Sequence, residues 1–304
     1  MRLLAFSSTS NWARRTVIGI PFVWLLLFFF LPFIIILKIS ISESDGIRFQ
    51  DLIQNIDGVL EIKAKWSNYA FMLTDALYAK AYWNALVYAF LTTIFCLLIG
   101  FPFAYFMARA PEHQRPALLL LVMLPFWTSF LLRIYAWKSI LANQGLLNQL
   151  LLSIGIIDAP LRIMNTPVSL MIGMVYAYLP FMILPLYAHL VKMDLRLLEA
   201  SADLGAKPWQ TFWLITIPLA KSGIIAGSML VFIPCIGEYV IPELLGGPET
   251  LMIARVLWDE FFSNNDWSMA ASVAVTMIVL IIVPLAVFNH FQAQSLDQQR
   301  RGEA

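Results

Sequence analysis

Six long apolar blocks constrain the fold of this 304-residue chain more strongly than any other feature of its sequence. An α-helix needs about 20 mostly apolar residues to cross the hydrocarbon core of a bilayer. Six blocks reach this length, at residues 17–37, 82–108, 117–138, 168–190, 221–242 and 268–291. The sequence therefore predicts an all-α integral membrane protein with six transmembrane helices. We expect a transmembrane domain over 17–291, flanked by an N-terminal tail, 1–16, and a C-terminal tail, 292–304.

The composition supports a membrane protein and excludes two other classes. A soluble globular domain carries about 25% charged residues, whereas this chain has 13% charged and 60% hydrophobic residues. A disordered chain would need far fewer apolar residues. The net charge of +1 gives no indication of a nucleic-acid partner, and we expect none. Cys96 and Cys235 both lie inside apolar blocks, where we expect small buried hydrophobes rather than a disulfide.

The positive charges predict the orientation of the helices, because Lys and Arg concentrate in short cytoplasmic loops. If the N-terminus is cytoplasmic, the four inside segments hold eleven of the twenty Lys and Arg residues but only six of the nineteen Asp and Glu residues. Arg14, Arg15, Arg300 and Arg301 then lie on the same side of the membrane. We therefore expect both termini in the cytoplasm.

The sequence motifs of nucleotide-binding and hydrolytic enzymes are absent. There is no G-x-x-x-x-G-K-[ST] loop for ATP phosphates, no H-E-x-x-H zinc helix and no G-x-S-x-G turn around a nucleophilic serine. The three histidines, His113, His189 and His290, lie at predicted helix ends and are too dispersed for one metal site. We therefore expect a non-enzymatic chain with no catalytic residue, no metal site and no bound cofactor.

A loop of unusual regularity lies between the fourth and fifth apolar blocks, at 194–219. Asp194 is a favourable N-cap, and 195–204 consists of strong helix formers. Gly205 suits a helix C-terminus with positive φ, and Pro208 suits the first turn of a second helix. The spacing predicts a rigid helix–turn–helix elbow. A further segment, 146–157, is too short to span and is expected to form an amphipathic helix at the surface.

The elbow resembles the EAA loop of the permease subunits of binding-protein-dependent ABC importers. The family pattern is E-A-A-x3-G-x9-I-x-L-P. The chain has Glu199, Ala200 and Ser201, then Gly205 after three intervening residues, then ITIP after nine more. It departs from the pattern at Ser201, where the family has Ala, and at Ile217, where the family has Leu. The alternative is an ordinary amphipathic hairpin between two helices.

The resemblance implies a type I ABC importer permease fold and a coupling helix that docks on an ATP-binding subunit. The coupling residues that it implies are Glu199, Ala200, Ser201, Asp203, Leu204 and Gly205. The implied partners are a homologous second permease, two copies of an ATP-binding subunit that holds ATP and Mg, a periplasmic binding protein, and the lipids of the bacterial inner membrane.

Two further regions narrow the resemblance to the polyamine branch of this family. LLVMLPFWTSFLLRIYAW at 120–137, with NQGLLNQLLLSIGI at 143–156, is similar to the third helix and following loop of polyamine permeases. FIPCIGEYVIPELLGG at 232–247 is similar to their fifth helix and its outer turn. The order of features most resembles the permease that pairs with a second, homologous permease in a putrescine system. The resemblance implies inward transport of a polyamine, with putrescine as the expected substrate.

The fifth apolar block contains a carboxylate, Glu238. A charged side chain in hydrocarbon is costly and usually faces a cavity or a partner. Pro234 and Gly237 favour a break in the helix that would lower Glu238 toward the bilayer centre. We expect Glu238 to meet the amines of the substrate. The alternative is a helix-end acid that pairs with Arg133 or faces water outside.

Aromatic faces suit a polyamine because they attract cations. The candidate pathway aromatics are Trp127, Tyr135, Trp137, Tyr176, Tyr178 and Tyr239. The alternative for each is the belt of Trp and Tyr found at membrane interfaces. The outer acids are candidates for attracting cations or meeting the binding protein: Glu243, Asp259 and Glu260.

Three other functions compete with polyamine import. A permease of the same superfamily for another small solute differs only in substrate. A secondary transporter would need ion-coupling groups in mid-membrane and no docking loop. A lipid-modifying enzyme would need a cluster of polar catalytic residues at an interface, and the sequence contains no such cluster.

Overall fold

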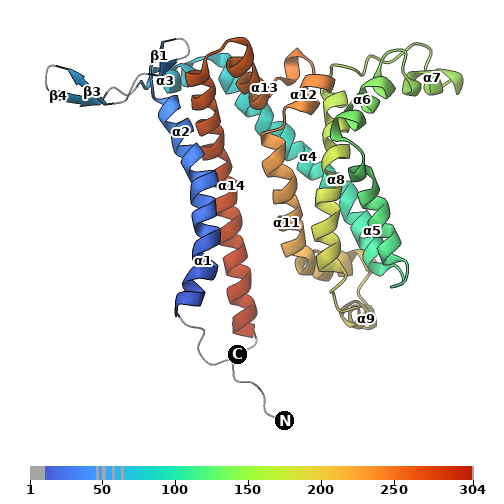
Figure 1. The fold of residues 1–304 in the computed structure, drawn as a ribbon. Helices are drawn as coiled ribbons and strands as arrows, with labels where there is room; N and C mark the ends of the chain where they lie inside the picture. The colour runs from blue at the N-terminus through green and yellow to red at the C-terminus, as the bar shows by residue number, and fades with distance from the viewer. Residues whose placement is uncertain (1–10, 46–47, 50–52, 57–58, 63–64, 303–304) are drawn as a thin grey trace. The chain divides into compact units, whose positions relative to one another are not determined.

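The computed structural model describes all residues except 1–10, 46–47, 50–52, 57–58, 63–64 and 303–304 (Figure 1). Among the described residues, five helices are long and apolar enough to cross a membrane, and a bent pair raises the number to six. The predicted helical membrane protein is therefore confirmed. The chain divides into two compact units, Met1–Thr74 with Asp259–Thr276 and Asp75–Trp258 with Met277–Ala304, which we describe separately.

The first unit contains the first span, two small hairpins and the beginning of the last helix. Its elements are α1 (Asn11–Leu25), the π-helix η1 (Leu26–Phe30), α2 (Leu31–Ser40), β1 (Ser44–Asp45), β2 (Arg48–Phe49), β3 (Ile53–Ile56), β4 (Val59–Ile62), α3 (Ser67–Thr74), η5 (Asp259–Ser263) and α14 (Trp267–Gly302). β1 pairs with β2, and β3 with β4, both antiparallel. These hairpins were not predicted from the sequence. Predicted tail residues 1–10 lie outside the described residues, whereas α14 continues to Gly302 through most of the predicted C-terminal tail.

A buried cluster of hydroxyl groups holds the first unit together. The last carbonyls of a helix lack partners within that helix. At the end of α2, the Ser268 hydroxyl donates to the Ser42 carbonyl and the Ser272 hydroxyl donates to the Ser40 carbonyl, at 3.0 and 2.9 Å. The Tyr69 hydroxyl of α3 donates to the Ser40 hydroxyl oxygen at 2.8 Å. Side chains of α14 and α3 thus satisfy the polar groups at the end of the first span.

The second unit contains the remaining helices and both candidate sites. Its elements before α14 are α4 (Ala76–Arg109), α5 (Arg115–Met123), η2 (Leu124–Trp127), α6 (Phe130–Leu141), α7 (Leu146–Ser153), α8 (Pro167–Leu190), α9 (Arg196–Asp203), α10 (Pro208–Thr211), the π-helix η3 (Phe212–Thr216), α11 (Ile217–Ile236), α12 (Val240–Leu245), η4 (Pro248–Thr250) and α13 (Ile253–Trp258). Within this unit, α9 lies at one end of the bundle and α12 at the other (Figure 1). The predicted surface helix at 146–157 corresponds to α7.

Small residues let α4, α8 and α11 pack closely. Ala81, Ala85 and Ala89 are fully buried on one face of α4 at intervals of one helical turn. A Cβ added to Gly227 of α11 would lie 2.7 Å from the sulfur of Met182 on α8. Transmembrane helices associate mainly through such close contacts, because lipid provides no hydrophobic force between them. Cys96 and Cys235 are buried in the same core as free thiols, as predicted.

The third predicted span is not one straight helix. The helical segment Arg115–Trp127 and the segment that starts at Phe130 meet at an angle of 86°. Between them, Thr128 and Ser129 have ψ angles of 153° and 134°, and the Thr128 hydroxyl donates to the Pro125 carbonyl at 2.7 Å. Such a side-chain bond to the backbone competes with the helical pattern. The expectation of a continuous helix over 117–138 is therefore wrong.

The fifth predicted span ends at Ile236, six residues before the predicted end at 242. Gly237 and Glu238 leave the helix, and α12 begins at Val240. Pro234 lies two residues before the end of α11, and its ring disfavours a regular helix around it. The predicted break at this proline and glycine is confirmed.

Candidate functional site

The elbow at 194–219 has the predicted helix–turn–helix form. The Asp194 carboxylate accepts a hydrogen bond from the backbone N–H of Arg196 at 3.0 Å, which caps the start of α9. Gly205 follows α9 with a φ of 80°, in the left-handed region where glycine pays no Cβ penalty. Pro208 is the first residue of α10. The turn between the two helices is therefore fixed by local chemistry.

One polar contact inside the elbow joins its two helices. The hydroxyl oxygens of Ser201 on α9 and Thr211 on α10 are 2.8 Å apart, and Ser201 Oγ also donates to the Leu198 carbonyl. Ser201 is only 6% exposed. This contact braces α9 against α10. The sequence predicted no role for Thr211, because a pairing across ten residues depends on the turn geometry.

The other predicted coupling residues lie on the surface of the elbow. They are Glu199, Ala200, Asp203, Leu204 and Gly205. Leu204 is 88% exposed, which is unusual for a leucine at a helix end. Ser201 points inward, so it is the one predicted coupling residue that the structure places inside the elbow.

An aromatic chain connects the elbow to α4. Phe212, the first residue of η3, packs edge-on against Phe101 of α4 with 5.5 Å between ring centroids. Phe101 stacks on Tyr105 at 6.4 Å, and the Arg109 guanidinium lies 4.9 Å from the centre of the Tyr105 ring. Phe212 makes this contact from the first position of a π-helical turn, which is a local irregularity in the helix. Apolar periodicity alone could not reveal it.

Glu238 lies at the break between α11 and α12 and accepts three hydrogen bonds. Its Oε1 accepts from the backbone N–H groups of Val240 and Ile241, at 2.9 and 3.3 Å. Its Oε2 accepts from the Tyr178 hydroxyl at 2.6 Å. Glu238 thus caps the start of α12 and links it to α8. The three donors hold both carboxylate oxygens in place.

The contact with Tyr178 places the Glu238 carboxylate deep in the bundle. Tyr178 lies eleven residues after Pro167 and twelve before Leu190, so its Cα is about 17 Å from either end of α8. Among the described residues, no Lys or Arg forms an ion pair with Glu238. The Arg133 guanidinium instead lies 5.0 Å from the centre of the Phe126 ring, on the other side of the bend in the third span. The alternative of a Glu238–Arg133 pair is therefore wrong.

The candidate pathway aromatics fall into three groups. Tyr178 binds Glu238 directly and is 8% exposed. Trp137 and Tyr176 pack edge-on with 5.3 Å between centroids. The remaining three candidates lie in other surroundings. Tyr239 stacks on Trp258 at 4.6 Å, Tyr135 lies 5.9 Å from the Lys138 ammonium, and Trp127 is 78% exposed.

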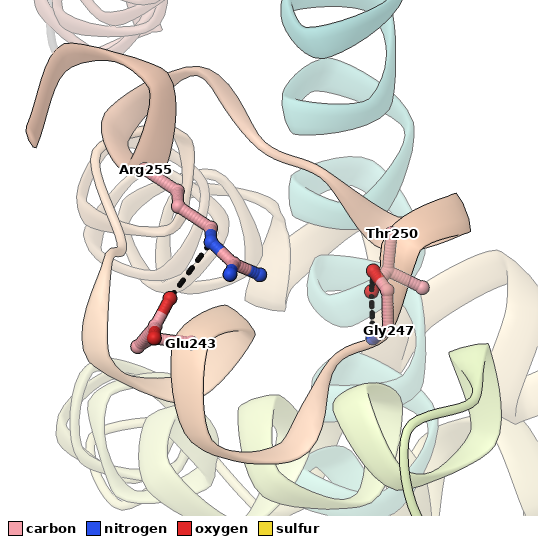
Figure 2. A network of polar contacts seen from close by, with 4 residues as sticks. All are labelled: Glu243, Gly247, Thr250 and Arg255. Atoms are coloured by element: carbon pink, nitrogen blue, oxygen red, sulfur yellow. Dashed lines mark hydrogen bonds and ion pairs between the residues drawn. The ribbon is translucent and has the colours of Figure 1, made fainter. Parts of the chain in front are cut away.

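The segment beyond Glu238, residues 240–258, forms a compact outer turn of α12, η4 and α13. Figure 2 shows Arg255 of α13 and Glu243 of α12 pointing toward each other, with 2.7 Å between Nε and Oε2. The Gly247 N–H donates to the Thr250 hydroxyl at 2.7 Å within the same turn (Figure 2). Ser169 of α8 donates to the Leu245 carbonyl at 2.7 Å. The sequence noted Glu243 as an outer acid but gave no sign of its basic partner.

No group of three or more metal-ligating side chains occurs in the part of the chain that the structure describes. At the break between α11 and α12, the structure brings together a carboxylate and a phenol, those of Glu238 and Tyr178. This donor set suits a cation held by one charge and hydrogen bonds.

Residues 4–298 match the family described as "Binding-protein-dependent transport system inner membrane component". The spermidine/putrescine transport system permease protein PotB of Haemophilus influenzae is 40% identical over 94% of this chain and 96% of its own length. The protein of the same name from Escherichia coli is 41% identical over 90% of this chain and 94% of its own length.

A solved structure also resembles the chain. It is a bacterial ABC transporter involved in the import of the acidic polysaccharide alginate, with a TM-score of 0.69 and 16% identity over 93% of this chain and 96% of that chain. This likeness confirms the predicted permease fold.

Proposed function

Because the chain belongs to the family of binding-protein-dependent transport system inner membrane components, we propose that it is the permease subunit of a bacterial polyamine importer. Family membership confirms a transport subunit of the inner membrane and the resemblance drawn from the elbow. It excludes the secondary transporter and the lipid-modifying enzyme. In this proposal the chain forms half of a pathway that carries a polyamine, with putrescine as the expected substrate, from the periplasm to the cytoplasm.

The observation that carries the polyamine proposal is the Glu238 carboxylate. It lies near the middle of α8 in depth and has three hydrogen-bond donors, but no cationic partner among the described residues. A charge at this depth that is not neutralised attracts a mobile cation. The similarity to PotB proteins, which are spermidine/putrescine permeases by name, supports an ammonium group as that cation.

Transport in this proposal depends on a change of partner at Glu238. An arriving ammonium group donates hydrogen bonds to the carboxylate and neutralises its charge, while the backbone N–H groups of α12 keep the carboxylate in place. The Tyr178 ring lies beside the site and offers a face to the methylenes and the ammonium. The Trp137 and Tyr176 pair provides a second aromatic surface.

In this proposal the elbow couples ATP hydrolysis on the partner subunits to transport. We place it and both termini in the cytoplasm, where the exposed face of α9 contacts one of two ATP-binding subunits. ATP hydrolysis takes place on those partners. A rigid elbow shifts the equilibrium between inward-open and outward-open states only if its partner binds the two states with different affinity. A homologous second permease completes the pathway, and a periplasmic binding protein delivers the substrate.

The test is uptake of labelled putrescine by the complete complex in proteoliposomes. Wild type is expected to accumulate putrescine only with ATP and the binding protein. Glu238→Gln keeps the size and the hydrogen bonds to α12 but removes the charge. The rate of uptake, measured at putrescine concentrations below the KM, is therefore expected to fall at least tenfold. Glu249→Gln, an exposed carboxyl group in η4, is the matched control and is expected to stay within twofold of wild type.

Two outcomes would contradict the proposal. Unchanged uptake by Glu238→Gln in a normally assembled complex would remove Glu238 from the pathway. A wild-type complex that accumulates another small cation with ATP and the binding protein, but neither putrescine nor spermidine, would assign the importer to another solute.

A further inference from the structure

The outer turn, residues 240–258, is held at several points, and only one of these contacts with described residues involves two full charges. Thr250 and Gly247 form reciprocal hydrogen bonds, and Asn84 of α4 donates to the Leu251 carbonyl at 3.0 Å. Tyr239 stacks on Trp258 between the two ends of the turn. These contacts involve neutral groups. The Glu243–Arg255 ion pair is the exception.

The geometry of this ion pair makes it exchangeable. A single nitrogen, Nε of Arg255, approaches a single oxygen, Oε2 of Glu243 (Figure 2). The two side chains keep 30% and 38% of their surface exposed, so neither is locked in the interior. A partly exposed pair with one contact contributes little net stability, in contrast to a bidentate pair of arginine and carboxylate. Another cation can therefore replace Arg255 at small cost.

The ion pair also lies close in sequence to Glu238, the carboxylate proposed for the pathway. Glu243 lies on α12, and Glu238 caps the first turn of that same helix through the N–H groups of Val240 and Ile241. A cation that leaves Glu243 therefore finds Glu238 as the next carboxylate toward the middle of the bundle. α12 lies at the end of the second unit opposite α9 (Figure 1), which is the side where the proposed function places substrate entry.

We propose that Glu243 is the outermost carboxylate of the polyamine route and that Arg255 is a resident cation that occupies it until an ammonium group takes its place. This inference rests on the proposed function and adds a specificity-determining pair to it. Arg255 excludes neutral solutes and anions, because only a cation can compete for the carboxylate. Its release also loosens α13 from α12 at the moment when the substrate arrives.

Removing either partner alone tests the proposal, because an exchange site and a structural brace predict different signs. In the complete complex, Glu243→Gln removes the receiving carboxylate and is expected to raise the KM for putrescine at least fivefold. Arg255→Gln removes the competitor and is expected to lower the same KM two- to threefold. Thr250→Val, which loosens the turn without changing a charge, is the control and is expected to leave the KM within twofold.

The results that overturn the inference are distinct from those that overturn the function. In a complex that takes up polyamine, a KM raised by both Glu243→Gln and Arg255→Gln means that the pair is only a brace. If the complex with Arg255→Gln fails to assemble, Arg255→Lys is used instead, because lysine keeps the charge but binds the Glu243 carboxylate more weakly. A raised KM for putrescine in that variant also means that the pair is only a brace. A wild-type complex that takes up no polyamine overturns the proposed function and this inference with it.

Discussion

The elbow and the outer turn are both short helix–turn–helix segments, at opposite ends of the second unit, yet different chemistry holds them. Neutral groups form the turn of the elbow and join its two helices: Gly205 in the left-handed region and two hydroxyls 2.8 Å apart. The outer turn has neutral contacts too, but carboxylates take part in it and in the break before it: Glu238 caps α12, and Glu243 pairs with Arg255. A cationic solute does not compete for a contact between neutral groups, whereas it does compete for a carboxylate.

This difference predicts how variants divide. Changes in the elbow are expected to lower the rate of ATP-driven uptake without changing the KM for the solute. Changes around the carboxylates are expected to change the KM. The four predictions below run from the largest expected effect to the smallest, and each tests this division.

The largest effect is expected at Gly205. Valine at a φ of 80° is strained by about 1–2 kcal/mol, so Gly205→Val is expected to reshape the elbow and reduce uptake at least fiftyfold. Asparagine tolerates this backbone region, so Gly205→Asn is the matched control and should keep at least a third of the activity. The protein level in the membrane is measured beside uptake. Equal uptake by the two variants would show that the turn geometry has no role in coupling.

Reversal of one exposed charge on α9 is expected to have the next largest effect. Glu199 lies in the first turn of α9 with an exposed side chain, so Glu199→Lys leaves the interior of the elbow intact. We expect at least a tenfold loss of uptake and of co-purified ATP-binding subunit, with an unchanged KM. A raised KM with normal co-purification would break the division between the two regions.

At the break between α11 and α12, Tyr178→Phe is expected to have a moderate effect that includes a change in the KM. It removes one of three hydrogen bonds to Glu238, and a bond to a charged group contributes about 1.5–3 kcal/mol. An ammonium group then supplies the missing donor and leaves more slowly. We expect both the KM and the maximal rate of uptake to fall two- to fivefold. A lower rate with an unchanged KM would place Tyr178 with the elbow residues.

The sequence predicted the elbow better than the region around Glu238, and the reason is physical. Asp194, Gly205 and Pro208 act within a few residues of their own position, so their effect can be inferred from spacing. The break at Pro234 and Gly237 was predictable for the same reason. The partners of Glu238 and Glu243 lie 60 residues and 12 residues away in the chain, and only the fold brings Tyr178 and Arg255 to them.

The bend in the third span was not predicted, because the length and hydropathy of an apolar block do not reveal a two-residue break. Thr128 and Ser129 are tolerated in an apolar block, yet the Thr128 hydroxyl competes with the helix for the Pro125 carbonyl. The same limit hid the aromatic contact from Phe212 to Phe101. Length and hydropathy therefore determine the number of spans, while local polar chemistry determines where a span bends.

The smallest effect is expected for the buried brace of the elbow. Ser201→Ala removes the hydroxyl pair with Thr211 and the bond to Leu198, and one such hydrogen bond contributes about 1 kcal/mol. Alanine fits the space and is the residue of the family pattern, so uptake is expected to fall no more than twofold with an unchanged KM. A double-mutant cycle with Thr211→Val isolates the pair. If the two hydroxyls act together, the double variant loses clearly less than the sum of the single losses in thermal stability. Additive losses would mean that the two hydroxyls do not brace α9 against α10, and that the turn at Gly205 alone makes the elbow rigid.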